Sequence, residues 1–161
     1  MEFKPKHTIF DSEKFQKNRE KLGGFILEGM ETTGGTDVDW LIEHKGGFIV
    51  LENKEFVNDS ISIKMGQMIA FEQLYKKLLP KCHFLFCGYD NIDFKNPESI
   101  IYYFDMKDWE AIRLTTEFNE KFKTYYVERK SMDPLTLKEF RDLIEQYWKE
   151  FENSQNSSKR F

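Results

Sequence analysis

The stretch that decides the fold runs Gly34-Gly35-Thr36-Asp37-Val38-Asp39-Trp40-Leu41-Ile42 and resumes as Gly46-Gly47-Phe48-Ile49-Val50-Leu51-Glu52-Asn53-Lys54. It predicts one strand over 38–43 and a second over 48–54, joined by a hairpin turn at His44-Lys45-Gly46-Gly47. A hairpin sets the start of its first strand opposite the end of its second. Asp39 and Glu52 are therefore expected to lie close together, although 13 positions separate them.

The second strand is apolar on both faces until its end. Strand side chains alternate, so Val50 shares a face with Glu52 and Lys54, while Ile49 and Leu51 point to the other face. A strand that is apolar on both sides is typical of the middle of a sheet. A charged pair at its end needs a partner or a metal, because isolated buried charges are unfavourable.

Two neighbouring carboxylates and an ammonium group predict a divalent-metal site. The carboxylates of Asp39 and Glu52 repel unless a cation lies between them, and Mg²⁺ prefers few carboxylates, several waters and phosphate oxygens. The backbone carbonyl of Asn53 is a further hard oxygen ligand. Lys54 adds positive charge where phosphodiester hydrolysis develops negative charge. The pattern is that of phosphodiester cleavage with Mg²⁺, for which Mn²⁺ commonly substitutes.

These motifs resemble the core of the PD-(D/E)XK nuclease superfamily of restriction endonucleases, Holliday-junction resolvases and recombination exonucleases. The first motif is carried by Gly35 to Ile42 and the second by Leu51 to Lys54, within a resemblance that covers about residues 11 to 88. No proline precedes the aspartate here. Asp39 is preferred as the ligand because the apolar strand follows it directly, whereas Asp37 is either a supporting group or the ligand itself.

The resemblance implies two further site positions on helices. An acidic residue is expected on a first helix over 11–22, where Asp11 is a candidate N-cap and Glu13 fits better than Glu20. Both glutamates are equally compatible with a solvated surface.

A glutamine is expected on the helix after Glu-x-Lys, which the sequence predicts over 61–79. On that helix one stripe at helical spacing holds Lys64, Gln67, Phe71, Leu74 and Leu78. Gln67 would bind the attacking water or a phosphate, and the alternative is an exposed polar first turn.

Composition indicates one domain over 1–152 with a flexible polar tail over 153–161. No apolar run reaches membrane-spanning length and no signal peptide is evident, so a cytoplasmic protein is expected, with Cys82 and Cys87 as structural thiols. The formal net charge of −4 is not that of a protein held on DNA by bulk charge. Candidate DNA contacts are Lys14, Lys17, Arg19 and Lys64, although lysines at the surface are more often simply solvated.

The whole chain predicts an α/β fold with a restriction-endonuclease-like core, a central mixed β-sheet flanked by helices in the order α-β-β-β-α-β, and a C-terminal helix. Besides the elements above, strands are expected over 24–30, 83–88, 100–105 and 124–128, a short helix over 107–112, and a long helix starting at Asp133-Pro134.

The expected function is a metal-dependent deoxyribonuclease in DNA recombination, repair, replication or restriction, with DNA as partner and no membrane. Two alternatives stay open: an inactive nuclease-fold module for nucleic-acid binding or assembly, and a metal-binding structural protein. A homodimer and a larger replication or recombination complex both remain open as the assembly.

Overall fold

The computed structural model describes residues 12–28 and 36–158. Contacts divide the chain into two compact units, Met1–Asp37 and Val38–Phe161. The described part of the first unit contains helix α1 (Ser12–Glu28), and the predicted N-cap Asp11 lies outside the described residues. None of the described helices combines the length and the apolar composition that a membrane crossing requires.

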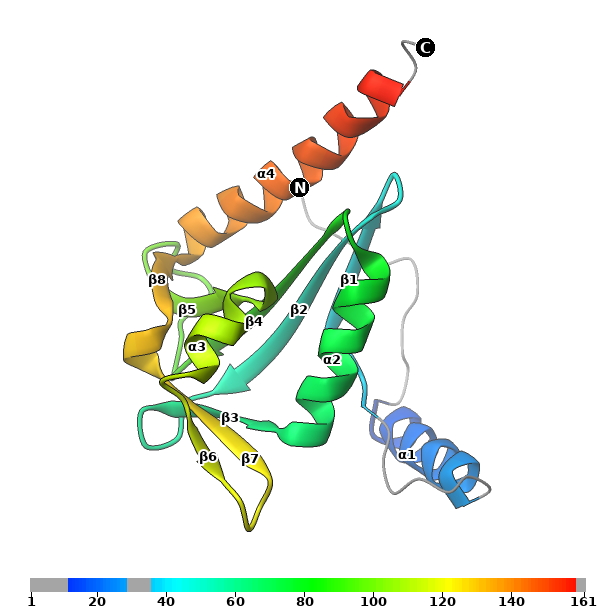
Figure 1. Ribbon diagram of the computed structural model, residues 1–161, viewed down its shortest axis with the longest axis vertical. Helices are drawn as coiled ribbons and strands as arrows, with labels where there is room; N and C mark the ends of the chain where they lie inside the picture. Colours follow the sequence, from blue (N-terminus) through cyan, green and yellow to red (C-terminus); the bar gives the residue numbers. More distant parts are fainter. Residues whose placement is uncertain (1–11, 29–35, 159–161) are drawn as a thin grey trace. The chain divides into compact units, whose positions relative to one another are not determined.

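The second unit is an α/β fold with a mixed central sheet flanked by helices, as the sequence predicts at this level (Figure 1). The sheet has the strand order β1 (Trp40–His44), β2 (Gly47–Glu55), β4 (Cys82–Tyr89), β5 (Ile100–Asp105) and β8 (Asp133–Thr136). Only the β2–β4 pair is parallel. A smaller antiparallel sheet has the order β3 (Ser60–Lys64), β7 (Thr124–Glu128) and β6 (Glu117–Asn119).

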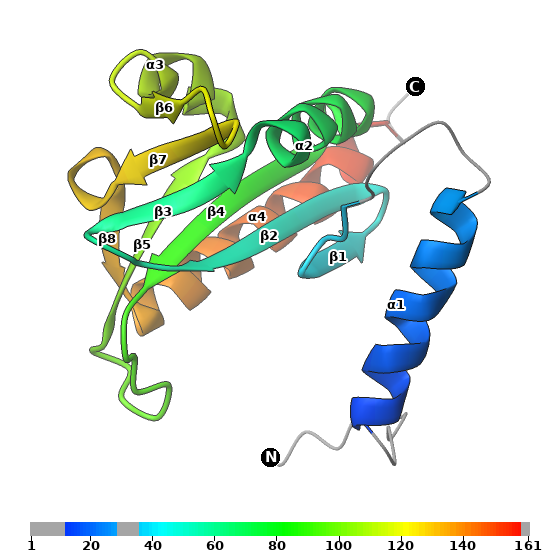
Figure 2. The ribbon, with the colours of Figure 1, turned by 90° about the horizontal axis from the view of Figure 1, so that it is seen from below.

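Helical segments connect and cover these strands. They are α2 (Met65–Leu78), the 3₁₀ turn η1 (Met106–Asp108), α3 (Trp109–Arg113), the 3₁₀ turn η2 (Arg129–Ser131) and α4 (Leu137–Ser158). Figure 2 shows α2 and the smaller sheet on one face of the central sheet, with α4 on the other. The inner strands β2 and β4 are therefore buried on both faces, whereas the edge strand β1 remains largely exposed.

The predicted hairpin is confirmed, and its turn explains its register. Lys45 and Gly46 both have positive φ, 49° and 78°, which is the backbone of a two-residue type I′ turn. The pairing runs from His44 opposite Gly47 to Trp40 opposite Leu51. Continuing it by one step sets Asp39 opposite Glu52.

The alternation predicted for β2 is also confirmed. Val50 belongs to an apolar cluster beneath α2 that includes Phe71 and Phe84, whereas Ile49 belongs to a second cluster beneath α4 that includes Leu85. All five of these residues are inaccessible to solvent. A strand fixed between two cores gives its last residues, where the charges lie, a firmly held backbone.

Two histidines from the central sheet anchor α4. The ring of His83 stacks on Tyr147 with 3.5 Å between centroids, and the ring of His44 stacks on Trp148 at 3.6 Å. The Nε2 atom of each ring lies 3.1 Å from a glutamate of α4, Glu150 for His83 and Glu152 for His44. The helix is thus attached to the sheet through polar and stacking contacts as well as through its apolar face.

Two predicted strand and helix boundaries are wrong. The strand predicted over 24–30 is wrong for residues 24–28, which belong to α1, and residues 29 and 30 lie outside the described part of the chain. Its short apolar run, Phe25-Ile26-Leu27, has no alternation and fits either structure. The helix predicted over 61–79 begins only at Met65, since Ser60–Lys64 form β3. In β3 the buried Ile61 and Ile63 alternate with the exposed Ser62, which is the two-residue period of a strand.

The C-terminal part departs from prediction at both ends of its helix. Asp133-Pro134 does not start the helix but lies in β8. This strand is at the edge of the sheet, where a proline, which has no backbone N–H to donate, is tolerated. The helix starts at a capping box, in which Thr136 Oγ1 accepts from the Glu139 backbone N–H at 3.1 Å and Glu139 Oε2 accepts from the Thr136 N–H at 3.0 Å. It continues to Ser158, past Asn153 where a frayed end is expected.

Candidate metal centre

Asp39 is held beside Glu52 by a backbone hydrogen bond. It lies immediately before β1, and its Oδ2 accepts from the Asn53 backbone N–H at 2.7 Å. Asn53 follows Glu52 on β2, so this bond ties the Asp39 carboxylate to the strand end that carries Glu52. The hairpin therefore brings the two acids together, as the sequence predicts.

Glu52 is a buried carboxylate with only one oxygen satisfied. Its residue is 3% exposed, and Oε1 lies 3.1 Å from both Lys54 Nζ and Gln67 Nε2. Oε2 is buried and has no hydrogen-bond partner among the described residues. Burial raises the pKa of this carboxyl above its ordinary value, and the hydrogen bond and charge of Lys54 lower it. The negative charge of Asp39 raises the pKa, whereas the Asp39 backbone N–H lowers it. A negative charge on Glu52 beside that of Asp39 is therefore unfavourable unless further positive charge is added to the site.

Lys54 and Gln67 complete a closed polar triangle with Glu52. The Lys54 ammonium donates to Gln67 Oε1 at 3.0 Å, while the Gln67 amide donates to Glu52 Oε1. Gln67 lies in the first turn of α2, and Phe71 lies one turn deeper and is inaccessible to solvent. The stripe argument thus places Gln67 correctly against Glu52 and Lys54, and its role with water or phosphate stays a prediction.

The arrangement fits a small divalent cation. Glu52 Oε2 is an unsatisfied carboxylate oxygen next to a second carboxylate, and an added cation would relieve both burial and repulsion. The described residues hold no group of three or more His, Cys, Asp or Glu side chains arranged around a metal position. Two carboxylates are consistent with Mg²⁺, which keeps several waters. The Asn53 carbonyl stays a predicted further ligand.

Most of the remaining predicted site residues belong to the first unit. Glu13, Lys14, Lys17 and Arg19 are exposed on α1 in the first unit, where Arg19 Nη2 lies 3.3 Å from Asp37 Oδ2. Asp37 thus pairs with α1 within the first unit, and the candidate Glu20 is exposed on the same helix. Lys64 is exposed at the end of β3, not on α2. Their roles as ligands or DNA contacts stay predictions.

The sequence analysis did not identify the backbone N–H of Asn53 that fixes the Asp39 carboxylate. The Asn53 N–H was available as a signal, because the hairpin register sets Asp39 opposite Glu52 and Asn53 is the next residue along β2. The two cysteines are free and buried, and burial raises the pKa of each thiol to about 12. For Cys87 the charge of Glu52 contributes to the same shift. Neutral thiols neither attack a substrate nor bind a metal well, in agreement with a structural role.

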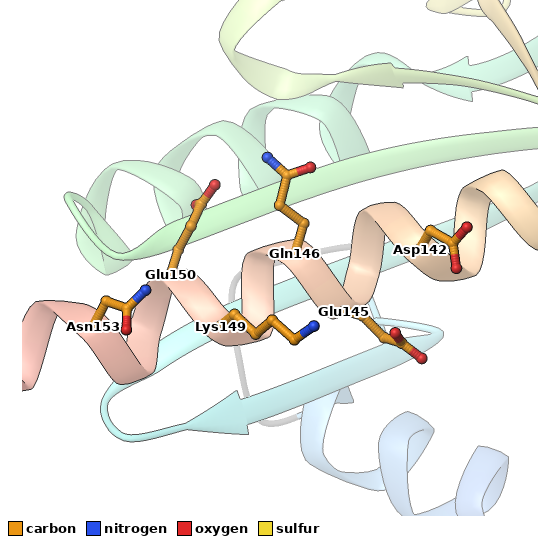
Figure 3. Close-up of a pocket in the computed structure, with 6 residues that line it drawn as sticks. All are labelled: Asp142, Glu145, Gln146, Lys149, Glu150 and Asn153. Carbon is orange, nitrogen blue, oxygen red and sulfur yellow. The ribbon is translucent and has the colours of Figure 1, made fainter.

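A surface hollow on α4 lacks the features of such a site. Its volume is about 490 Å³ and its lining consists of Asp142, Glu145, Gln146, Lys149, Glu150 and Asn153. Figure 3 shows that these side chains come from one helix and diverge, with Glu145 and Lys149 on one side and Gln146 and Glu150 on the other. The hollow is a solvated helix surface.

The sequence matches no protein-family model, and no curated protein matches it. Side-chain geometry therefore carries the functional proposal.

Proposed function

We propose that this protein is a metal-dependent nuclease of the PD-(D/E)XK type that hydrolyses DNA phosphodiester bonds. The observation that carries the proposal is the buried Glu52 carboxylate, whose Oε2 has no partner among the described residues while Asp39 and Lys54 lie beside it. The two carboxylates of Asp39 and Glu52 and the ammonium of Lys54 lie at the end of one hairpin. These are the types of group that Mg²⁺-dependent phosphodiester hydrolysis uses.

The chain order of elements supports a restriction-endonuclease-like core. The order α1, β1, β2, β3, α2, β4 reads α-β-β-β-α-β, and the candidate site lies at the end of β2. Two departures accompany this order. Its third strand is β3, because residues 24–28 of the predicted strand 24–30 belong to α1, and β3 pairs in the smaller sheet rather than in the central one. The related core is therefore proposed for the β1–β2 hairpin, α2 and β4.

In this proposal Asp39, Glu52 and the Asn53 carbonyl hold Mg²⁺. Bound there, the ion would polarise the scissile phosphate and increase the acidity of a nearby water. Lys54 supplies positive charge close to the phosphate, where negative charge grows during the reaction. Gln67 holds Lys54 and Glu52 in position through hydrogen bonds of 3.0 and 3.1 Å, respectively. By resemblance, the products carry a 5′-phosphate.

The test is cleavage of labelled DNA of several shapes with Mg²⁺, with Mn²⁺ and without metal. Glu52→Gln and Asp39→Asn keep size and polarity but remove the charge, so each should abolish metal-dependent cleavage in a folded protein. Asp37→Asn, made in parallel, shows which of the two aspartates is the ligand; in the structure Asp37 pairs with Arg19 on α1. Absence of cleavage by the unmodified protein on every DNA, or unchanged cleavage by Glu52→Gln, would overturn the proposal.

A further inference from the structure

A second cavity lies between the C-terminal half of α2 and the η1–α3 segment. Its volume is about 250 Å³, and its lining consists of Glu72, Tyr75, Lys76, Leu79, Met106, Lys107, Trp109, Glu110 and Arg113. Gln67, at the other end of α2, is nine residues from Lys76, which corresponds to about 13 Å along the helix. The cavity is thus separate from the candidate metal centre.

Part of the lining is apolar and aromatic. Met106 and Trp109 are 5% and 2% exposed, whereas Leu79 is 45% exposed. Trp109 Nε1 is buried and has no hydrogen-bond acceptor among the described residues. Such a donor is rare in a folded protein and calls for an acceptor. An apolar floor with an aromatic residue suits a planar ring.

The rest of the lining is charged, with a positive balance. Lys76, Lys107 and Arg113 contribute three cations, against the two carboxylates of Glu72 and Glu110. None of these three cations forms an ion pair with another residue in the part of the chain that the structure describes. The lining itself thus carries one net positive charge, while the carboxylates of Asp105 and Asp108 lie close enough to act on Tyr75. Lys77, the neighbour of Lys76 on α2, does not line the cavity.

We propose that this cavity binds a nucleoside 5′-monophosphate unit. The base packs against Tyr75, Met106 and Trp109, as bases do on aromatic side chains in single-strand-binding proteins. Lys76, Lys107 and Arg113 hold the phosphate through charge-assisted hydrogen bonds. The Glu72 and Glu110 carboxylates accept from the ribose hydroxyls or from an exocyclic amino group. The unit belongs either to a free mononucleotide or to a nucleic-acid strand, and the proposal does not rest on nuclease activity.

The experiment is a titration of the full chain, without divalent metal, followed by calorimetry and by NMR of ¹³C-methyl methionines and the indole N–H groups. Adenosine 5′-monophosphate, adenosine, inorganic phosphate and a short single-stranded oligonucleotide are the ligands. The mononucleotide should bind with a Kd of about 1 mM or tighter and shift the Met106 methyl and Trp109 N–H signals. Met68, buried on the first half of α2, should move little. Stronger binding by the oligonucleotide assigns the unit to a strand, and equal binding assigns it to a free nucleotide.

Variants locate the binding and can overturn the proposal. Lys76→Gln with Arg113→Gln should weaken the mononucleotide at least about tenfold, while Lys77→Gln, the matched control, should leave the Kd unchanged. Glu52→Gln should also leave it unchanged, because that residue lies at the other site. No shift at Met106, equal binding of inorganic phosphate alone, or equal weakening by Lys77→Gln would each overturn the assignment. Nuclease activity is measured separately, so either proposal can fail without the other.

Discussion

Replacing Lys54 by methionine should destabilise the protein, because it leaves the Glu52 carboxylate buried without its cation. Glu52 is 4% exposed at its side chain, and Lys54 Nζ lies 3.1 Å from its Oε1. Removing one partner of a buried pair typically costs about 3–5 kcal/mol. Here Gln67 still donates to Oε1, and the Lys54 side chain is 22% exposed. The lower end, about 3 kcal/mol, is therefore expected, which lowers Tm by about 6–12 °C for a chain of this size.

The loss of stability in Lys54→Met should increase with pH. Burial raises the folded-state pKa of Glu52 above its ordinary value, so the folded state binds the proton more tightly than the unfolded state. The contribution of Glu52 to stability is therefore full below the unfolded pKa and is lost as pH rises through the folded pKa. Lys54 opposes this shift, and its removal moves the folded pKa higher. The deficit of Lys54→Met should thus be small in acid and grow towards alkaline pH.

The assay is urea unfolding of the wild type and Lys54→Met at about pH 5 and at about pH 8, without divalent metal. Lys54→Met/Glu52→Gln is the control, because a neutral amide at position 52 no longer needs the cation. The double variant should lose less stability than the sum of the two single variants. A deficit that is equal at both pH values, or strict additivity, would refute the buried-pair reasoning.

Four further outcomes are expected. Phe71→Ala should cost about 3–5 kcal/mol in urea unfolding as a large-to-small core change, whereas Ile69→Ala, at a position 51% exposed on the same helix, should cost little. Thr136→Ala, which removes the N-cap of α4, should lower stability by about 1 kcal/mol, and no change would show that the capping box is dispensable. Gln67→Ala should slow Mg²⁺-dependent DNA cleavage about 10–100-fold, which single-turnover kinetics would measure. Lys54→Ala should reduce the cleavage rate about 10²-fold with little change in DNA affinity, and a loss of affinity at an unchanged single-turnover rate would assign Lys54 to phosphate binding.

Local signals were sufficient for the hairpin and for the side chains it carries. Gly46 and the apolar run from Phe48 to Leu51 specify a turn and a buried strand without reference to the rest of the chain. Alternation along that strand then places Glu52 and Lys54 on one face. The contact with Gln67 followed from helical spacing, because Phe71 on the same stripe had to face the core.

The errors lie where local sequence is compatible with two structures. Ile61 and Ile63 fit a helix face as well as a strand, and only their pairing with β7 decides for the strand. A stronger signal was present at Asn58-Asp59, whose positive φ values of 50° and 62° form the turn that starts β3. Pro134 suggested a helix start, but the edge of the sheet beside β5 accepts it equally well.

The residues of the candidate metal centre are synthesised before the strand that completes their burial. Asp39, Glu52, Lys54 and Gln67 lie on β1, β2 and α2 or beside them, whereas β4, whose Phe86 is the register partner of Glu52, begins only at Cys82. As the chain leaves the ribosome, the hairpin emerges first and its two carboxylates are still hydrated. Their repulsion is present once the hairpin forms, and the burial of Glu52 is completed when β4 docks against β2. Under the proposed metal-dependent function, refolding is expected to be faster in Mg²⁺ than in its absence.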